Sequence, residues 1–408
     1  MYKVSTPQMN VSIWILGFAL SLLLPTGVFA QAKIPLIEAT NEKAFIRDGD
    51  QVNLAWKLDP AAKPDVYYVN IPTKKSKVKI TTDQGSLTFY TEPGKTYPFL
   101  VRLNKKDTCF VEIAAKLPPE LPQISMHSAE SDTVSFPFEL RGSKLYFQGR
   151  INKKNVNVQF DLGAGTSVVN RNFSEKLGLK FSHHTIVSNT SGINKERTSI
   201  GNILNIGNAE WVGVPLTEVG NMRSDEDLII GNGFFRDRVI EIDYDTKQLV
   251  VYNNLPDKIK QYRKLPVFYE QNRPKFKARL THNGKRYNFW FLFDTGRDGT
   301  MLLGEDFTGI DDHWRALQPL TVINGKKIVR LDADIAGFSF KDLVTNAADP
   351  AKPNGRPSLF GNQILSHFNV ILDNINGHIY LKLNQRVNEP FFDYNSYLKE
   401  IEKSKVNK

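Results

Sequence analysis

Two aspartates, each followed two positions later by a glycine, are the residues of this sequence best suited to chemistry. Asp161 lies in FDLGAGTSVV (160–169), and Asp294 lies in FLFDTGRDGT (291–300). Two carboxyls held side by side cannot easily both ionise, so they share one proton, and the pair can act as base and acid together. This chemistry suits hydrolysis of an amide by an activated water, with no metal and no cofactor.

The sequence around the two aspartates repeats, which predicts an equivalent structural setting for each. Asp161 and Asp294 are 133 positions apart, and so are Gly192 and Gly325, which we expect at the tips of two β-hairpins. Before each Asp, apolar residues alternate in the same phase: Val156, Val158 and Phe160 in the first copy, and Phe289, Phe291 and Phe293 in the second. Each Asp therefore leaves a strand at an equivalent register.

A second pair of glycine motifs extends the repeat. IIG ends at Gly231 and LFG ends at Gly361, 130 positions apart, so one gap of three residues reconciles these landmarks with the first ones. Each motif is followed by a strand, a polar turn and another strand. The pattern predicts a duplicated lobe.

The rest of the chain must support this repeat. Between 31 and 116, short runs rich in β-branched and aromatic residues alternate with polar turns, at the spacing of a small sandwich. We therefore predict a mostly β protein in which two duplicated lobes form one cleft, preceded by a small β-sandwich-like domain. The predicted divisions are a signal peptide (1–30), an N-terminal β-domain (31–116), a linker (117–133), a first lobe (134–253), an inter-lobe connection (254–273), a second lobe (274–385) and a polar tail (386–408).

The N-terminus has the pattern of an export signal. Lys3 precedes the apolar run 11–24, and small residues precede a cut after Ala30. We expect export to the periplasm or cell envelope, or secretion, with an N-terminal membrane anchor as the alternative. After signal cleavage no membrane span is expected. Cys109 is the only cysteine, so no internal disulfide can form.

Composition excludes other classes of function. The net charge of +10 arises from 53 basic and 43 acidic residues, which are spread along the chain. The basic residues are not interleaved with aromatic residues as in a nucleic-acid-binding module, so no nucleic-acid partner is predicted. His183 and His184 have no second cluster of ligands at suitable spacing, so we predict no metal and place them in a surface loop.

The tripeptide Asp294-Thr295-Gly296, the two later glycine motifs and the hairpin glycines resemble the retropepsin-like aspartic peptidases over about 134–383. The resemblance implies a peptide or protein substrate bound in extended form beneath two flaps. Retropepsins are usually homodimers of one lobe, whereas here both lobes belong to one chain, so a monomer is expected. The implied roles are catalysis by Asp161 and Asp294, support of the catalytic loops by Gly163, Thr295 and Gly296, flap tips at Gly192 and Gly325, and second glycine motifs at Gly231 and Gly361.

Two positions depart from the family pattern. The family has Thr or Ser after each Asp, and these hydroxyls hydrogen-bond across to the other lobe, which Leu162 cannot do. Arg297 stands where the family has Ala or Ser. Its charge could favour ionisation of both aspartates, pair with Asp298, or select acidic side chains from the cleft. Two functions remain open: an exported aspartic endopeptidase, and a catalytically impaired pseudo-peptidase that binds peptides or proteins.

Overall fold

The computed structural model describes residues 34–48, 54–116, 124–128, 133–189, 192–310, 312–352, 356–391, 398, 399 and 402. The predicted signal peptide lies outside the described residues, and so do most of the predicted linker and most of the predicted tail. None of the helices in the described ranges is long and apolar enough to cross a membrane.

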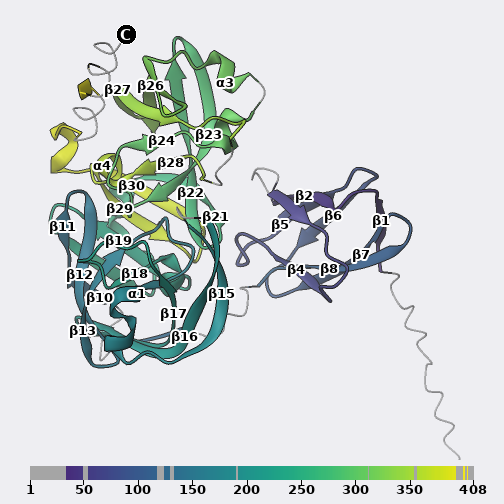
Figure 1. Cartoon of the computed structure of the whole chain (residues 1–408), viewed down its shortest axis with the longest axis horizontal. Coiled ribbons are helices and arrows are strands. Elements are labelled where there is room, and N and C mark those ends of the chain that lie inside the picture. Colours follow the sequence, from purple (N-terminus) through teal and green to yellow (C-terminus); the bar gives the residue numbers. More distant parts are fainter. Residues whose placement is uncertain are drawn as a thin grey trace, which may run out of the picture.

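The structure is mostly β, as predicted, and an N-terminal unit lies to one side of two larger lobes (Figure 1). The N-terminal unit consists of two four-stranded sheets, β1-β7-β8-β4 and β3-β2-β5-β6, that share one core containing Val78, Phe99 and Ile113. This arrangement is the expected small sandwich. Its strands are β1 (Leu36–Ala39), β2 (Lys43–Asp48), β3 (Leu54–Lys57), β4 (Asp65–Tyr68), β5 (Ser76–Thr81), β6 (Ser86–Thr91), β7 (Thr96–Leu103) and β8 (Asp107–Ala114).

The first lobe is a closed barrel in which β12, β13, β18, β14, β17 and β16 pair in that order and β16 returns to β12. β9 pairs with the edge of β17, although it lies inside the predicted linker. Ile124 and Met126 pack against the barrel core, and this small apolar contact draws the segment onto the barrel. The elements are β9 (Ser125–Ser128), β11 (Glu139–Arg141), β12 (Lys144–Ile151), β13 (Lys154–Phe160), β14 (Val168–Asn170), α1 (Arg171–Ser174), the 3-10 turn η1 (Glu175–Leu177), β15 (Phe181–Asn189), β16 (Gly192–Ile206), β17 (Ala209–Val219), β18 (Leu228–Ile230) and the 3-10 turn η2 (Asn232–Phe235).

The second lobe has a similar order of strand pairing. β22 pairs with β23, β23 with β28 and β28 with β24, while β26 joins β22 to β27. A parallel bridge between Leu303 and Ala347 connects the β24 side to β27. The duplication itself stays a prediction. The elements are β22 (Arg273–His282), β23 (Lys285–Asp294), β24 (Met301–Leu302), α2 (Glu305–Thr308), α3 (His313–Ala316), β25 (Thr321–Ile323), β26 (Lys326–Ile335), β27 (Phe338–Ala347), β28 (Leu359–Gly361) and α4 (Asn362–Leu365).

A run of six strands, β10-β20-β19-β29-β30-β21, joins the two lobes at their base. The junction is the antiparallel pairing of β19 with β29, in which Val239 faces Asp373. The predicted inter-lobe connection contains a 3-10 turn and the strand β21, which pairs with β30 and then with β22. The elements are β10 (Thr133–Pro137), β19 (Val239–Asp243), β20 (Gln248–Tyr252), η3 (Asp257–Gln261), β21 (Arg263–Glu270), β29 (Phe368–Asp373), β30 (His378–Leu383) and η4 (Gln385–Asn388).

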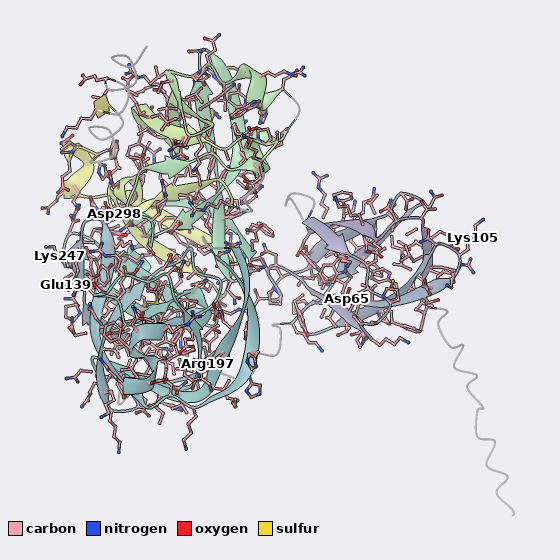
Figure 2. All side chains as sticks on the ribbon, in the orientation of Figure 1. Asp65, Lys105, Glu139, Arg197, Lys247 and Asp298 are labelled. Atoms are coloured by element: carbon pink, nitrogen blue, oxygen red, sulfur yellow. The ribbon has the colours of Figure 1, made fainter. Side chains whose placement is uncertain are left out.

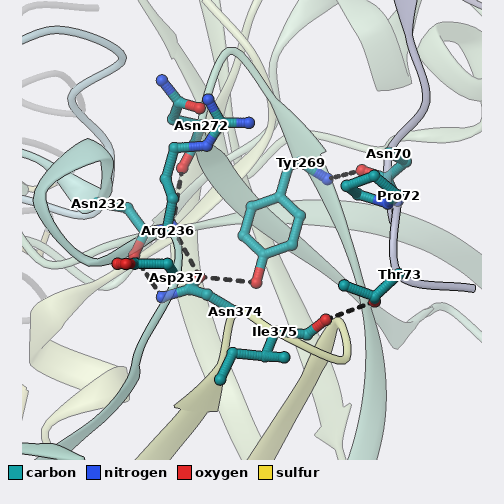
Figure 3. Close-up of a pocket in the computed structure, with 10 residues that line it drawn as sticks. All are labelled: Asn70, Pro72, Thr73, Asn232, Arg236, Asp237, Tyr269, Asn272, Asn374 and Ile375. Carbon is teal, nitrogen blue, oxygen red and sulfur yellow. Dashed lines mark hydrogen bonds between the residues drawn. The ribbon is translucent and has the colours of Figure 1, made fainter. Parts of the chain in front are cut away.

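The loop between β4 and β5 attaches the N-terminal unit to the lobes (Figure 3). The Asn70 side chain accepts a hydrogen bond from the Tyr269 backbone N–H at 2.6 Å, and the Thr73 hydroxyl donates to the Ile375 carbonyl at 2.6 Å. These residues line a pocket of about 210 Å3 that also includes Asn232. Neither of the two candidate catalytic aspartates lines this pocket, which marks a junction between units.

Candidate active site

The strands β13 and β23 deliver the two aspartates to equivalent places. Each strand pairs in parallel with the short strand that carries the second glycine motif of its lobe: Phe160 faces Ile230, and Asp294 faces Gly361. Phe160 and Phe293 are fully buried, so the alternating apolar residues fix the register at which each Asp emerges. Asp161 and Asp294 as whole residues keep some contact with solvent, while their carboxyls are largely withdrawn from water.

The two carboxyls meet and hydrogen-bond to each other. The Gly296 backbone N–H donates to Asp161 Oδ1 and to Asp294 Oδ1, at 3.1 Å in each case. The Gly163 N–H donates to Asp161 Oδ1 at 2.7 Å, and the Arg297 N–H donates to Asp294 Oδ1 at 2.9 Å. The structure therefore brings together residues that are 133 positions apart and holds both acids with backbone donors.

The glycines of the catalytic loops are required by close approach. A Cβ on Gly163 would lie 2.6 Å from Cγ of Asp294, and a Cβ on Gly296 would overlap the carboxyl of Asp161. Each glycine thus lies against the acid of the opposite lobe. Any side chain at either position would push the two carboxyls apart, because atoms this close repel strongly.

The local electrostatics favour one shared proton. Burial, and then the negative charge of Asp294, raises the pKa of Asp161 to about 8. Burial also raises the pKa of Asp294, but the hydrogen bond from Asp161, the charge of Arg297 and two backbone N–H donors counteract this rise. Each carboxyl accepts two backbone N–H donors, but the hydrogen bond between the carboxyls and the charge of Arg297 both favour the ionised form of Asp294. Asp294 is therefore the carboxyl that ionises first, and Asp161 keeps the proton.

One half of the predicted cross-brace between the catalytic loops is present. The Thr295 hydroxyl accepts a hydrogen bond from the Leu162 backbone N–H at 2.9 Å and donates to the Phe160 carbonyl at 3.2 Å. Thr295 is fully buried, so these bonds are shielded from water. The Leu162 side chain is also fully buried and belongs to the main hydrophobic core. Leu162 therefore supplies packing where the family pattern has a second hydroxyl.

The structure distinguishes among the three roles expected for the charge of Arg297. Asp298 accepts hydrogen bonds from the Ser143 backbone N–H at 3.0 Å and from the Ser143 hydroxyl at 2.8 Å, so it bridges to the first lobe. Figure 2 shows Asp298 at the boundary between the lobes. No ion pair joins Arg297 to Asp298 in the described part of the chain. Arg297 instead acts on Asp294 through its charge and lines a pocket beside the catalytic loop.

The second glycine motifs pack directly on the catalytic loops. A Cβ on Gly231 would overlap the carbonyl oxygen of Ala164, and a Cβ on Gly361 would overlap that of Gly299. The Gly361 N–H donates to the Thr300 carbonyl at 2.7 Å. These motifs therefore press the loops that carry the aspartates into place.

The asparagines that follow these glycines were missed by the sequence analysis. Asn362 donates from its side chain to the Ser143 carbonyl and accepts from the Tyr244 hydroxyl at 2.6 Å. Asn232 likewise donates to the Asn272 carbonyl at 3.2 Å. Each asparagine thus binds the hairpin tip of the opposite lobe. The repeated GN dipeptide at the two glycine motifs was the signal that could have identified them.

The two predicted flap glycines lie in hairpins. Gly192 pairs with Asn189 at the end of the β15–β16 hairpin, whose tip residues lie outside the described ones. Asn324 and Gly325, with φ of 50° and 76°, form the two-residue turn between β25 and β26. Positive φ at both positions is the hairpin geometry that favours Asn-Gly.

The predicted surface loop at His183 and His184 is a strand. Both residues lie in β15, and both are exposed. Their pairing partners on β16 are Thr198 and Arg197, which offer no imidazole or thiolate to a metal. Within the described residues, no group of three or more His, Cys, Asp or Glu side chains is arranged to hold a metal ion.

Comparison with known proteins bears on this geometry. Residues 147–234 match the model of a family described as aspartyl protease. Comparison with curated proteins gave no match. The matched segment begins in β12 and ends in η2, so it contains Asp161, Gly231 and Asn232. The first lobe is thus similar to aspartyl proteases, and the match supports an aspartyl protease family for this protein.

Proposed function

We propose that this protein is an aspartic endopeptidase in which Asp161 and Asp294 together activate one water molecule. The observation that carries the proposal is the Gly296 N–H, which donates to an oxygen of each carboxyl at 3.1 Å. A donor shared in this way keeps the two acids within reach of a single proton. The aspartyl protease match over residues 147–234 supports the same chemistry.

The electrostatics suggest a distinct role for each acid. Asp294, as the ionised member, removes a proton from the water while the water oxygen attacks the peptide carbonyl carbon. Asp161 gives its proton to the carbonyl oxygen, which leaves a neutral tetrahedral diol. Asp294 then gives the proton it took from the water to the amide nitrogen, Asp161 takes a proton back from a diol hydroxyl, and the C–N bond breaks. The products are a new carboxyl and a new amine, and no covalent intermediate forms.

The hairpins support a role in holding the substrate. Lys326 follows Gly325 at the tip of the β25–β26 hairpin and lines the same pocket as Arg297, which follows the catalytic loop glycine. This proximity favours Gly325 as a flap position. We assign the matching role to Gly192 in the first lobe. A flap of this kind would exclude water from the reacting bond.

The test is cleavage of a diverse peptide library by the mature chain in water enriched in oxygen-18. We expect new termini with one heavy oxygen in each new carboxyl, because water is the direct nucleophile. Asp161→Asn and Asp294→Asn should each abolish cleavage. Products that persist in either variant would contradict the proposal.

The pseudo-peptidase alternative is a distinct outcome of this experiment. Leu162 favours it, because only one hydroxyl braces the catalytic loops. If the wild type retains peptides without cleaving them, and both Asn variants retain them equally, the protein is a binding module.

Export and a monomeric state complete the proposal. The apolar run 11–24 and the small residues Val28 and Ala30 before the expected cut support an exported protein of the periplasm, the cell envelope or the external medium. Because one chain supplies both aspartates, catalysis does not require a second copy. Mass measurement of the protein recovered from the cell envelope, together with light scattering, would test both points.

A further inference from the structure

A small pocket beside the catalytic loop of the second lobe is lined by basic side chains. Its volume is about 150 Å3, and its described lining residues are Arg297, Leu302, Lys326, Asn346, Ala348 and Arg356. Three of these six residues are cationic, and none is acidic. Since one water occupies about 30 Å3 of liquid, the space suits a side chain of a few heavy atoms.

Arg297 connects this pocket to the two aspartates. Its backbone N–H donates to Asp294 Oδ1 at 2.9 Å, so the pocket begins one residue beyond the catalytic loop glycine. Its side-chain Nε is buried and has no hydrogen-bond partner among the described residues. A buried guanidinium N–H without an acceptor is unfavourable, so the site favours a ligand that brings one.

Lys326 approaches the pocket from the hairpin. It is partly exposed, and within the described part of the chain neither Lys326 nor Arg297 forms an ion pair. A guanidinium and an ammonium that line one pocket attract a carboxylate, which accepts charge-assisted hydrogen bonds from both.

We propose that this pocket binds the carboxylate of an Asp or Glu side chain in the substrate, so that the enzyme prefers an acidic residue next to the cleaved bond. The inference rests on the proposed peptidase function and names its substrate class. Selectivity should act on one side only, because the position that matches Arg297 in the first lobe is Ala164, which has no charge.

The experiment compares peptides that differ only by Glu or Gln at each position around a cleaved bond, all with amidated C-termini. The quantity measured is the ratio of kcat/KM for the Glu peptide to that for the Gln peptide, so a general loss of activity cancels. At one position on one side, we expect a ratio of at least roughly tenfold in the wild type. Lys326→Gln and Arg297→Ala should each reduce it severalfold, and Lys326→Glu should reduce it further.

The control variant is Lys341→Gln, which removes an exposed lysine of the same lobe that pairs with Asp332. It should keep the wild-type ratio, and thermal melts should show that every variant is folded. A ratio near one at all positions, or a ratio that the pocket variants leave unchanged, would overturn the inference. The Gln peptide is also tested with a free C-terminal carboxylate, and a preference only for that form would overturn the inference in favour of binding to the chain end.

Failure of the peptidase proposal can be recognised separately. If no peptide is cleaved, calorimetry can still compare the binding affinities of the same Glu and Gln peptides. Tighter binding of the Glu peptide that is lost in Lys326→Gln would support the pocket while rejecting catalysis. Equal binding of both peptides would reject the pocket as well.

Discussion

At the scale of single residues, the Thr295 hydroxyl supplies one of the two cross-braces that the family pattern places between the loops carrying the aspartates. This hydroxyl holds the Leu162 N–H and the Phe160 carbonyl of the opposite lobe, while the Leu162 side chain fills the core instead. The sequence predicted this loss of one brace, because leucine has no donor or acceptor. It could not predict that the remaining hydroxyl would bind both backbone groups at once, since that depends on the relative position of the lobes.

Removing this hydroxyl should affect both stability and activity. Thr295→Val leaves a buried N–H and a buried carbonyl without their partner, which should cost about 1–3 kcal/mol of unfolding free energy. The loops should also lose precision, so kcat should fall at least roughly tenfold. Chemical denaturation and peptide cleavage would measure the two effects.

The matched control for this variant is Thr91→Val in the N-terminal sandwich. The Thr91 hydroxyl is also buried, and it donates to the Ser76 carbonyl at 3.2 Å. This change should lower stability without lowering kcat. Equal kcat in Thr295→Val and in the wild type would show that the brace does not position the acids.

The shared proton predicts a pH dependence with two limbs. Above pH about 8 Asp161 loses its proton, so both acids are ionised and cleavage should fall. At low pH Asp294 also becomes protonated, and the base is lost. Because the charge of Arg297 lowers the pKa of Asp294, Arg297→Ala should shift the acid limb to higher pH.

The measurement for this prediction is kcat/KM against pH on a peptide without acidic side chains, so that the basic pocket contributes little. Lys341→Gln again serves as the control for a lost positive charge. An acid limb that stays in place in Arg297→Ala would show that the guanidinium does not act on the pair.

At the scale of elements, the alternation of apolar residues was the most reliable predictor of where each aspartate leaves its strand. Two strands with the same alternation end in aspartates that hydrogen-bond to each other, because burying one face leaves only one register for each strand. The short strand β9 could not be predicted in the same way. It has four residues, and its pairing with β17 depends on an edge that only the folded barrel provides.

A substitution in the second glycine motif tests how this element positions the neighbouring loop. In Gly361→Ala the new methyl group would overlap the Gly299 carbonyl oxygen, so the catalytic loop of the second lobe must shift. We expect a loss of about 1–3 kcal/mol of stability from overpacking, together with a large loss of cleavage.

The control for this loop variant is Gly85→Ala, where an added methyl group would meet no atom within 4 Å. It should leave stability and cleavage close to the wild type. A Gly361→Ala variant with wild-type cleavage would mean that the glycine motif does not position the loop.

At the scale of the whole molecule, side-chain amides join parts that are far apart in the sequence. Asn232 and Asn362 each bind the opposite lobe, and Asn70 joins the N-terminal sandwich to the base of the second lobe. Neither composition nor periodicity could predict the hydrogen-bond partners of these asparagines, because a single polar residue does not form part of a periodic apolar pattern. Only the repeat in the sequence indicated that Asn232 and Asn362 occupy equivalent positions.

The role of the N-terminal sandwich can be tested at its junction. Asn70→Ala removes the acceptor of the Tyr269 N–H and should weaken the attachment by about 1 kcal/mol. We expect faster proteolysis between the sandwich and the lobes while peptide cleavage persists. Asn41→Ala, which removes a side-chain acceptor of the Lys43 N–H inside the sandwich, is the control. Unchanged proteolysis would show that Asn70 does not hold the units together.

The most direct test of the whole account is the rate of peptide cleavage by Asp161→Asn, Asp294→Asn and the double variant, measured beside the wild type. If the two acids work as one pair, each single change should reduce kcat/KM as far as the double change does, because half a pair cannot share a proton. A single variant that keeps a rate close to the wild type, or losses that simply add in the double variant, would contradict catalysis by the Asp161–Asp294 pair.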